Sequence, residues 1–268
     1  MSDSVLLTRR GALAEITLNR PQVHNAFDDV LVAALQAALD EVAGDDSVRF
    51  VLLAGAGKSF SAGADLNWMR GMAGLSEAEN RADSQRLAAL MRTLNFLPKP
   101  TIARVHGAAY GGGVGLVACC DIAIGVQGAK FSLSEVKLGL VPAVISPYVV
   151  AAMGARHARR LFSTGEIFEA EHAMRIGLLH EAVAPDELDA AIDRVVHWLG
   201  KGGPIAQREA KALALRIGGM DAASAATVDT LNAELIARLR VSEEGQHGLS
   251  AFLDKRAPRW VVTEKERS

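Results

Sequence analysis

Two glycine-containing segments decide how this chain folds: KSFSAGADL at residues 58–66 and GAAYGGG at residues 107–113. Each follows a short apolar run, FVLLA at 50–54 and TIARV at 101–105, that is typical of a buried strand. Glycine and alanine after a strand let the main chain approach a ligand closely, and two convergent N–H groups stabilise a developing oxyanion. The pattern therefore indicates chemistry on a carbonyl or thioester.

Outward from these segments, the first part of the chain predicts a hairpin, a helix and a strand. Apolar residues alternate over 4–8 and 13–18 on either side of Arg9-Arg10-Gly11, as in an antiparallel hairpin. Residues 28–45 repeat apolar positions at helical spacing, with Asp28 or Asp29 placed to cap the helix. The strand at 50–54 then completes a strand, helix, strand unit.

The same alternation continues and then gives way to helices. We expect a helix at 76–97, a strand after Pro100, a helix beginning near Gly113 and a short strand at 121–124. Alternating strands and helices favour a mixed α/β core with a largely parallel sheet. Beyond about Ala155 the strand signals thin out, and helical patterns follow at 156–161, 169–176, 187–199, 204–216 and 222–239. The tail at 263–268 is polar.

Composition excludes several functional classes. The 268 residues are 50% hydrophobic and 22% charged, which is typical of a soluble globular protein. The formal net charge of −2 gives no excess of positive charge for binding nucleic acid. Gly57-Lys58-Ser59 resembles the end of a phosphate-binding loop, but Leu52 stands where that loop needs a glycine.

The cysteine pattern and the lack of a signal-like apolar run indicate a reducing compartment. Cys119 and Cys120 are adjacent, would face opposite sides of an extended strand, and are expected to be small buried residues. No histidine or cysteine spacing indicates a metal site, and no apolar run suits a signal or a membrane span. We therefore expect a cytoplasmic protein with neither metal nor membrane partner.

The ordered motifs resemble one family over nearly the whole chain. FSAGADL and GAAYGGGVGLVACCDIA are similar to two signature blocks of the enoyl-CoA hydratase/isomerase (crotonase) superfamily. Further matches lie at 17–21, 25–26, 131–139 and 251–256. The resemblance implies a crotonase-like α/β spiral of repeated ββα units over residues 1–200. It also implies a helical C-terminal oligomerisation region over 201–268, in a homotrimer or homohexamer.

The resemblance also implies a site. The oxyanion hole would be the N–H groups of Ala64 and Gly112, with Gly112 starting a helix whose positive end favours the thioester enolate. The acyl-CoA would be bound along Asn25, Ala26, Ala62, Asp65, Leu66 and Gly115 in addition to these two residues. For Asp65, a helix N-cap is an alternative role. Coenzyme A is part of the substrate, and no separate cofactor is expected.

Glu135 is the expected acid and base. Within Leu133-Ser134-Glu135-Val136 it has apolar neighbours and matches the family residue that transfers a proton at the α-carbon. A carboxyl in a desolvated pocket has a raised pKa, which suits a group that accepts and donates protons near neutrality. The alternative is an exposed glutamate at a strand edge or helix cap.

One departure from the hydratase pattern is equally informative. Familiar hydratases carry a second glutamate where this chain has Gly115. Either Glu135 alone handles water and the α-proton, with Ser146 or Tyr148 as possible compensating residues, or the reaction needs a single base. The lost side chain is also expected to enlarge the pocket for a branched or carboxylated acyl group.

The resulting hypothesis is a hydro-lyase that adds water to an α,β-unsaturated acyl-CoA. The motifs are most similar to bacterial methylglutaconyl-CoA and isohexenylglutaconyl-CoA hydratases, which implies a 3-substituted glutaconyl-CoA in leucine or acyclic terpene catabolism. An enoyl-CoA Δ3,Δ2-isomerase with Glu135 as sole base is one alternative. A non-catalytic CoA-binding scaffold is another.

Overall fold

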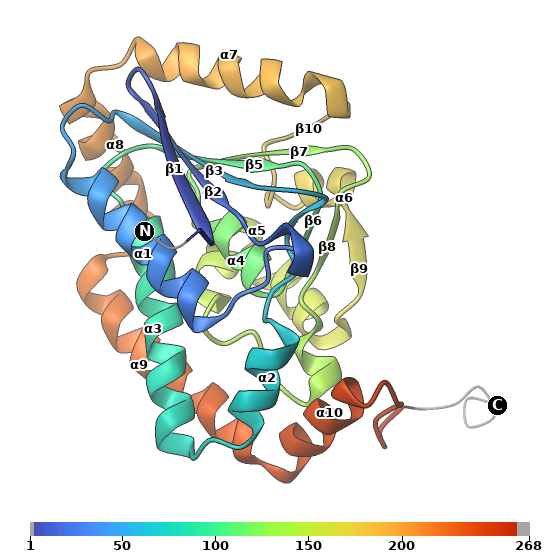
Figure 1. Cartoon of the computed structure of the whole chain (residues 1–268). Coiled ribbons are helices and arrows are strands. Elements are labelled where there is room, and N and C mark those ends of the chain that lie inside the picture. The colour runs from blue at the N-terminus through green and yellow to red at the C-terminus, as the bar shows by residue number, and fades with distance from the viewer. Residues whose placement is uncertain (1–2, 262–268) are drawn as a thin grey trace.

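A large, mostly parallel sheet runs through the centre of the protein, for which a computed structural model describes residues 3–261 (Figure 1). The hairpin predicted at the start is present and forms one edge, with Val5 opposite Leu18 in antiparallel register. The next four strands add in parallel. In spatial order the sheet contains β1 (Val5–Arg10), β2 (Leu13–Leu18), β3 (Phe50–Gly55), β5 (Thr101–Val105), β7 (Ile122–Val126) and β10 (Glu181–Val183).

A second, smaller sheet makes the fold a spiral. Its strands β4, β6 and β8 are parallel neighbours, and β9 pairs antiparallel with β8. The chain passes from a large-sheet strand to a small-sheet strand and then to a helix three times in succession. This confirms the predicted repetition of ββα units. The small-sheet strands are β4 (Ser59–Ser61), β6 (Ala108–Tyr110), β8 (Lys130–Ser132) and β9 (Ile167–Glu169).

Helices cover the sheets, and their starts follow ordinary capping chemistry. Asp28 accepts a hydrogen bond from the N–H of Leu31 at 2.8 Å, and Ser76 forms a capping box with Glu79. A 3-10 helix, η2 (Ser134–Leu138), follows β8. The α-helices up to residue 200 are α1 (Asp29–Gly44), α2 (Leu66–Ala73), α3 (Glu77–Asn95), α4 (Gly112–Cys119), α5 (Ser146–Thr164), α6 (Ala170–Arg175) and α7 (Leu188–Gly200).

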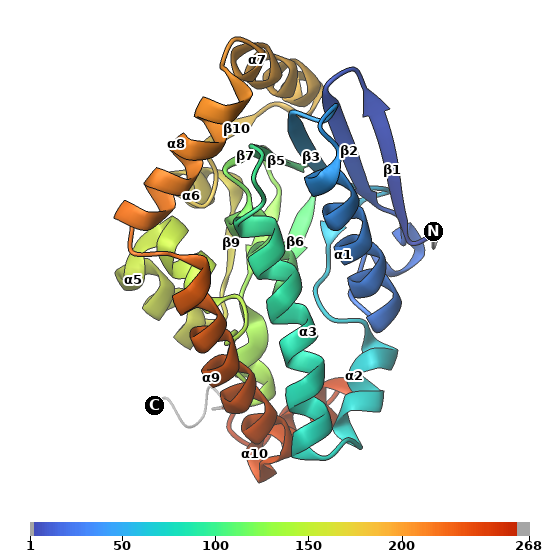
Figure 2. The ribbon, with the colours of Figure 1, turned by 90° about the vertical axis from the view of Figure 1, so that its left-hand side faces the viewer.

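The C-terminal helices return to the core of their own chain. They are α8 (Pro204–Ile217), α9 (Ala222–Val241) and α10 (Glu243–Leu253). Figure 2 shows α9 running beside α3, and α10 lies at the end of the molecule near α2. Helix α10 also packs against η2. The predicted helical region is therefore present, while its role in oligomerisation stays a prediction.

The structure differs from the sequence-based expectations at short elements. Strands β9 and β10 lie beyond Ala155, where the strand signals thin out, because three residues are too few to show an alternating pattern. Helix α2 was anticipated only through the alternative role of Asp65 as a helix N-cap. Cys119 ends helix α4 rather than lying in a strand, and both it and Cys120 are buried and free. The polar tail at 263–268 lies outside the described residues.

The hydrophobic core joins both sheets to the helices. Its largest fully buried side chains include Phe27, Phe60, Phe131 and Tyr148, from segments far apart in the sequence. Phe27 is also one wall of the cavity described below, so the core and that cavity are continuous. Among residues 3–261, no helix combines the length and apolarity needed to cross a membrane.

Candidate active site

Three loops converge because three parallel neighbours end at the same edge of the small sheet. Strand β4 leads into residues 62–65, β6 into Gly111 and Gly112, and β8 into Glu135. Parallel strands place their carboxyl ends together, so residues from three successive repeats meet there. The spiral therefore brings together the segments that the sequence singled out.

The N–H of Ala64 is left free by a backbone bridge on its other side. Phe27 donates its N–H to the Gly63 carbonyl at 2.6 Å, and Asp65 donates to the Phe27 carbonyl at 2.8 Å. Because successive groups of an extended chain face opposite sides, the N–H of Ala64 points away from Phe27. Gly63 has φ +80°, and a Cβ there would lie 2.9 Å from the Tyr110 carbonyl oxygen.

The N–H of Gly112 is the first of helix α4. Gly111 precedes the helix with φ +50°, a left-handed conformation that glycine adopts without strain. A Cβ on Gly112 would lie 2.6 Å from Cε2 of Phe27, so this residue must be small. Within residues 3–261 neither Ala64 nor Gly112 donates its N–H to a backbone acceptor. A helix N-terminus adds positive potential at this point.

Glu135 brings a carboxyl to these amides. Its Oε1 lies 3.1 Å from where a Cβ of Gly111 would be, and its Oε2 is shielded from water with no hydrogen-bond partner among the described residues. Burial raises its pKa to about 7, against a smaller opposing effect of its own backbone N–H. Glu135 is therefore not the exposed glutamate of the alternative interpretation, although it does lie in the first turn of η2.

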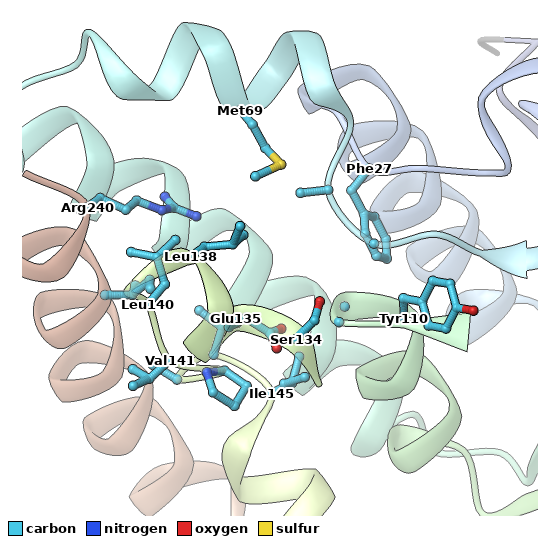
Figure 3. A pocket seen from close by; sticks show the side chains of 18 of the residues that line it. Phe27, Met69, Tyr110, Ser134, Glu135, Leu138, Leu140, Val141, Ile145 and Arg240 are labelled. Atoms are coloured by element: carbon cyan, nitrogen blue, oxygen red, sulfur yellow. The ribbon is translucent and has the colours of Figure 1, made fainter. Parts of the chain in front are cut away.

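The amides and the carboxyl open into a cavity of about 260 Å³, drawn in Figure 3. Its walls are mostly apolar, which favours desolvation of bound groups. Figure 3 shows Glu135 between Tyr110 on one side and Arg240 on the other. Apolar lining residues include Phe27, Trp68, Met69, Met72, Leu87, Leu138, Leu140, Val141, Val144, Ile145, Ile236, Leu249 and Phe252.

Four of the predicted site residues line this cavity: Ala62, Ala64, Gly112 and Glu135. The other five, Asn25, Ala26, Asp65, Leu66 and Gly115, are not among its lining residues. The structure thus brings together the expected oxyanion amides and the expected acid, and it places most of the expected CoA contacts outside the cavity wall.

Two of these outlying residues hold the first loop in place. The Asn25 amide donates to the carbonyls of Ala56 and Ser59 at 2.8 Å and accepts from the Arg20 N–H, so its side chain is fully used inside the protein. Asp65 caps α2 and forms an ion pair with Arg20 at 3.1 Å, which matches its alternative role.

The remaining outlying residues differ in exposure. Leu66 begins α2 and is 49% exposed, so its side chain lies on the surface beside the loop. Ala26 is buried. Gly115 is also buried, within α4. Of these three residues, only Leu66 therefore presents a side chain at the surface.

The structure does not show the enlarged pocket expected at Gly115. A Cβ there would lie 2.3 Å from Cγ2 of Ile145, so the Ile145 side chain occupies the space a larger residue would need. Ser146 donates to the Ala143 carbonyl, and Tyr148 is buried in the core. Neither lines the cavity, so neither replaces a second carboxyl.

The residues that close the far side of the cavity were not predicted from the sequence. Ile236 and Arg240 come from α9, and Leu249 and Phe252 come from α10. Helical spacing of Ile236 and Arg240 places them on one face of α9. Nothing in the local sequence indicated which element that face would meet.

A ββα spiral that presents two free amides beside a shielded carboxyl is suited to chemistry at the α-carbon of a carbonyl compound. Comparison with known protein families identifies an enzyme of the same type. The enoyl-CoA hydratase/isomerase family model matches residues 8–263, and the chain belongs to this family. The predicted superfamily and the predicted enoyl-CoA hydratase-type enzyme are confirmed.

Individual relatives are similar over almost their whole length. The crotonyl-CoA hydratase of Syntrophomonas wolfei is 30% identical over 261 residues, which cover 97% of this chain and 98% of the relative. A crystal structure of an enoyl-CoA hydratase from Shewanella pealeana is 45% identical with a TM-score of 0.78, covering 96% of each chain. One from Mycobacterium avium is 36% identical with a TM-score of 0.86, covering 97% of this chain and all of that one (100%).

Proposed function

We propose that this protein is a hydro-lyase that adds water across the double bond of an α,β-unsaturated acyl-CoA. The observation that carries the proposal is the shielded carboxyl of Glu135, with its pKa of about 7, beside the loop that presents the Gly112 amide. Such a carboxyl is close to half ionised at neutral pH and can both take and return a proton. The hydratase names of the relatives support hydration.

The reaction requires a place for negative charge. In our proposal the thioester oxygen accepts hydrogen bonds from the N–H groups of Ala64 and Gly112, which stabilise the enolate that forms when the β-carbon is attacked. Preorganised backbone donors need no rearrangement as charge develops. The apolar walls strengthen these interactions by excluding water.

Proton transfer then falls to a single residue. Ionised Glu135 accepts a proton from water while the water oxygen bonds to the β-carbon, and the electron pair of the double bond moves to the α-carbon and thioester. The protonated Glu135 next donates that proton to the α-carbon. Water is thereby divided into a hydroxyl on one carbon and a hydrogen on the other, and Glu135 is restored. One carboxyl is sufficient for these steps. This agrees with the structure, where Gly115 stands in place of a second glutamate and the Ile145 side chain occupies the space that a larger residue would need.

For the substrate we propose a 3-substituted glutaconyl-CoA, either 3-methylglutaconyl-CoA or isohexenylglutaconyl-CoA, used in leucine or acyclic terpene catabolism. The resemblance of the sequence motifs supports this choice, and one cavity residue discussed below supports a carboxylated acyl group. A cytoplasmic homotrimer or homohexamer is likewise proposed from the family resemblance.

Turnover in oxygen-18 water tests the reaction. The purified protein is incubated with crotonyl-, 3-methylcrotonyl-, 3-methylglutaconyl- and 3-hexenoyl-CoA, and the masses of the products are measured by mass spectrometry. Hydration predicts one labelled oxygen in the product, fastest with the glutaconyl substrate, and saturated butyryl-CoA is the control that takes up no label.

Two other outcomes would overturn the proposal. Conversion of 3-hexenoyl-CoA to its unlabelled 2-enoyl isomer, without label in any product, would identify the isomerase that uses Glu135 as sole base. Tight binding of all four thioesters without any conversion would identify the scaffold protein.

A further inference from the structure

Arg240 is a cation in the wall of an otherwise largely apolar cavity. It lies near the end of α9, and its side chain extends toward the cavity from the side opposite Tyr110 (Figure 3). The side chain is only 11% exposed. The other charged residues lining the cavity are Glu135 and the exposed Lys137 of η2.

The contacts of Arg240 use one nitrogen. Its Nη1 lies 3.1 Å from the Ser84 hydroxyl and 3.4 Å from both Asn80 Oδ1 and Asp83 Oδ2, all on α3. Among residues 3–261, no acceptor is found for Nη2 or Nε. Guanidinium groups bind carboxylates best through two parallel N–H donors, so Arg240 retains donors for a ligand.

The protein compensates this cation incompletely. Asp83 is 3.4 Å from Arg240, and it also pairs with Arg86 at 2.9 Å. Asp83 is therefore shared between two cations, of which Arg86 is exposed to solvent and Arg240 lines the cavity. A desolvated charge is costly unless it is paired and hydrogen-bonded, so an anion arriving from the cavity would be stabilised here.

Arg240 and Glu135 line the cavity from different elements, α9 and η2 (Figure 3). Burial raises the pKa of Glu135, while the pKa of Arg240 is lowered by burial and raised by Asp83. The two ends can therefore hold different parts of one substrate. The thioester belongs at the amides, and the remainder of the acyl group extends toward α9.

We propose that Arg240 binds the free carboxylate at the far end of a carboxylated acyl group and so makes the cavity selective for monothioesters of dicarboxylic acids. This inference rests on the proposed function, because it assumes that the thioester lies at Ala64 and Gly112. A neutral acyl chain of the same length would leave Arg240 without its second partner and would bind less well.

Binding of saturated thioesters tests the inference without requiring turnover. The affinities of glutaryl-CoA and butyryl-CoA are measured by calorimetry for the wild type, Arg240→Met, Arg240→Lys and Arg238→Met. Arg238 is an exposed residue of the same helix that does not line the cavity, so its variant is the control for lost charge.

We expect Arg240→Met to weaken glutaryl-CoA binding about a hundredfold, the order for losing one partner of a buried charge pair, and to leave butyryl-CoA binding nearly unchanged. Arg240→Lys keeps the charge without the planar pair of donors and should lose about tenfold. Arg238→Met should match the wild type. Succinyl- and adipyl-CoA added to the series identify the acyl length at which Arg240 matters most.

The opposite results are equally definite. Equal losses for both thioesters, or a wild type that does not prefer glutaryl-CoA, would show that Arg240 only packs α9 against α3. The wild-type preference and the Arg240→Lys variant decide the question even if Arg240→Met fails to fold. Hydration without a glutaryl preference would overturn only this inference. A glutaryl preference without hydration would overturn only the proposed reaction.

Discussion

The near end of the cavity is made of main chain, whereas the far end is made of side chains. At the near end, strands β4, β6 and β8 deliver free amides and a carboxyl, and Gly63 and Gly112 sit where a Cβ would collide with a neighbour. At the far end, α9 and α10 contribute Arg240 and apolar side chains. The near end tolerates little change in backbone position, while the far end can change side chain by side chain.

This difference assigns separate tasks to the two ends. Backbone donors stabilise the same developing charge in any thioester, so they define the reaction. Side chains from the last helices contact the part of the acyl group that varies between substrates, so they define selectivity. Substitutions at the near end should therefore reduce the rate for all substrates, and those at the far end should alter the ranking of substrates.

The largest effect is expected at the near end, from Glu135→Gln. Loss of the proton-transferring carboxyl should lower kcat at least about a thousandfold for every substrate, while glutamine keeps the shape of the side chain. Steady-state kinetics and calorimetry with butyryl-CoA would measure turnover and binding separately. Glu77→Gln, an exposed residue at the start of α3, is the matched control. Wild-type turnover by Glu135→Gln would contradict the assignment.

A smaller loss is expected when the backbone alone is disturbed, in Gly63→Ala. At φ +80° the new Cβ is strained and lies 2.9 Å from the Tyr110 carbonyl oxygen, so the Ala64 amide must shift. Misplacing one oxyanion donor should lower kcat about a hundred- to a thousandfold.

A remote glycine separates this effect from backbone strain. Gly128→Ala has nearly the same φ, +78°, and open space around its Cβ. It should lose stability of about 1 kcal/mol and keep its activity, as measured by thermal unfolding and initial rates. Equal activity in the two variants would show that the position of the Ala64 amide does not limit turnover.

The smallest effect is the dependence of hydration on pH. Water addition requires ionised Glu135, whose pKa is raised to about 7, so kcat/KM should rise with pH up to about that value. Below it, the rate should fall by up to about tenfold for each unit. Because kcat/KM reports the pKa of the free enzyme, crotonyl-CoA and a glutaconyl-CoA should give the same midpoint. A midpoint of kcat that differs between the two bound substrates would mean that the two ends of the cavity are coupled.

The near end was predictable because its information is local. A glycine after a buried strand and a glutamate among apolar residues are visible in short segments, and Gly112 does begin a helix as expected. The far end was not, because Arg240 reaches the cavity only through the packing of α9 on α3. Ile145 was missed for the same reason, since its contact with Gly115 joins α4 to the turn before α5.

Some local patterns were also ambiguous in principle. Asp65 suits both a ligand contact and an N-cap, and the structure uses it as the cap of α2. The small-sheet strands have three residues each, too few to reveal a period of two. The spiral was therefore inferred from family resemblance and not from periodicity.

The shielded carboxyl of Glu135 also bears on how strongly the protein resists unfolding. Its pKa is about 7 in the folded chain and 4.5 in an exposed reference, so the folded state holds the extra proton between these values. The raised pKa of Glu135 adds at most about 3 kcal/mol to the free energy of unfolding. This contribution is fully present below about pH 4.5 and is lost as pH rises through 7. In the absence of substrate, the free energy of unfolding thus decreases over the same pH range in which Glu135 ionises and becomes able to act as the base.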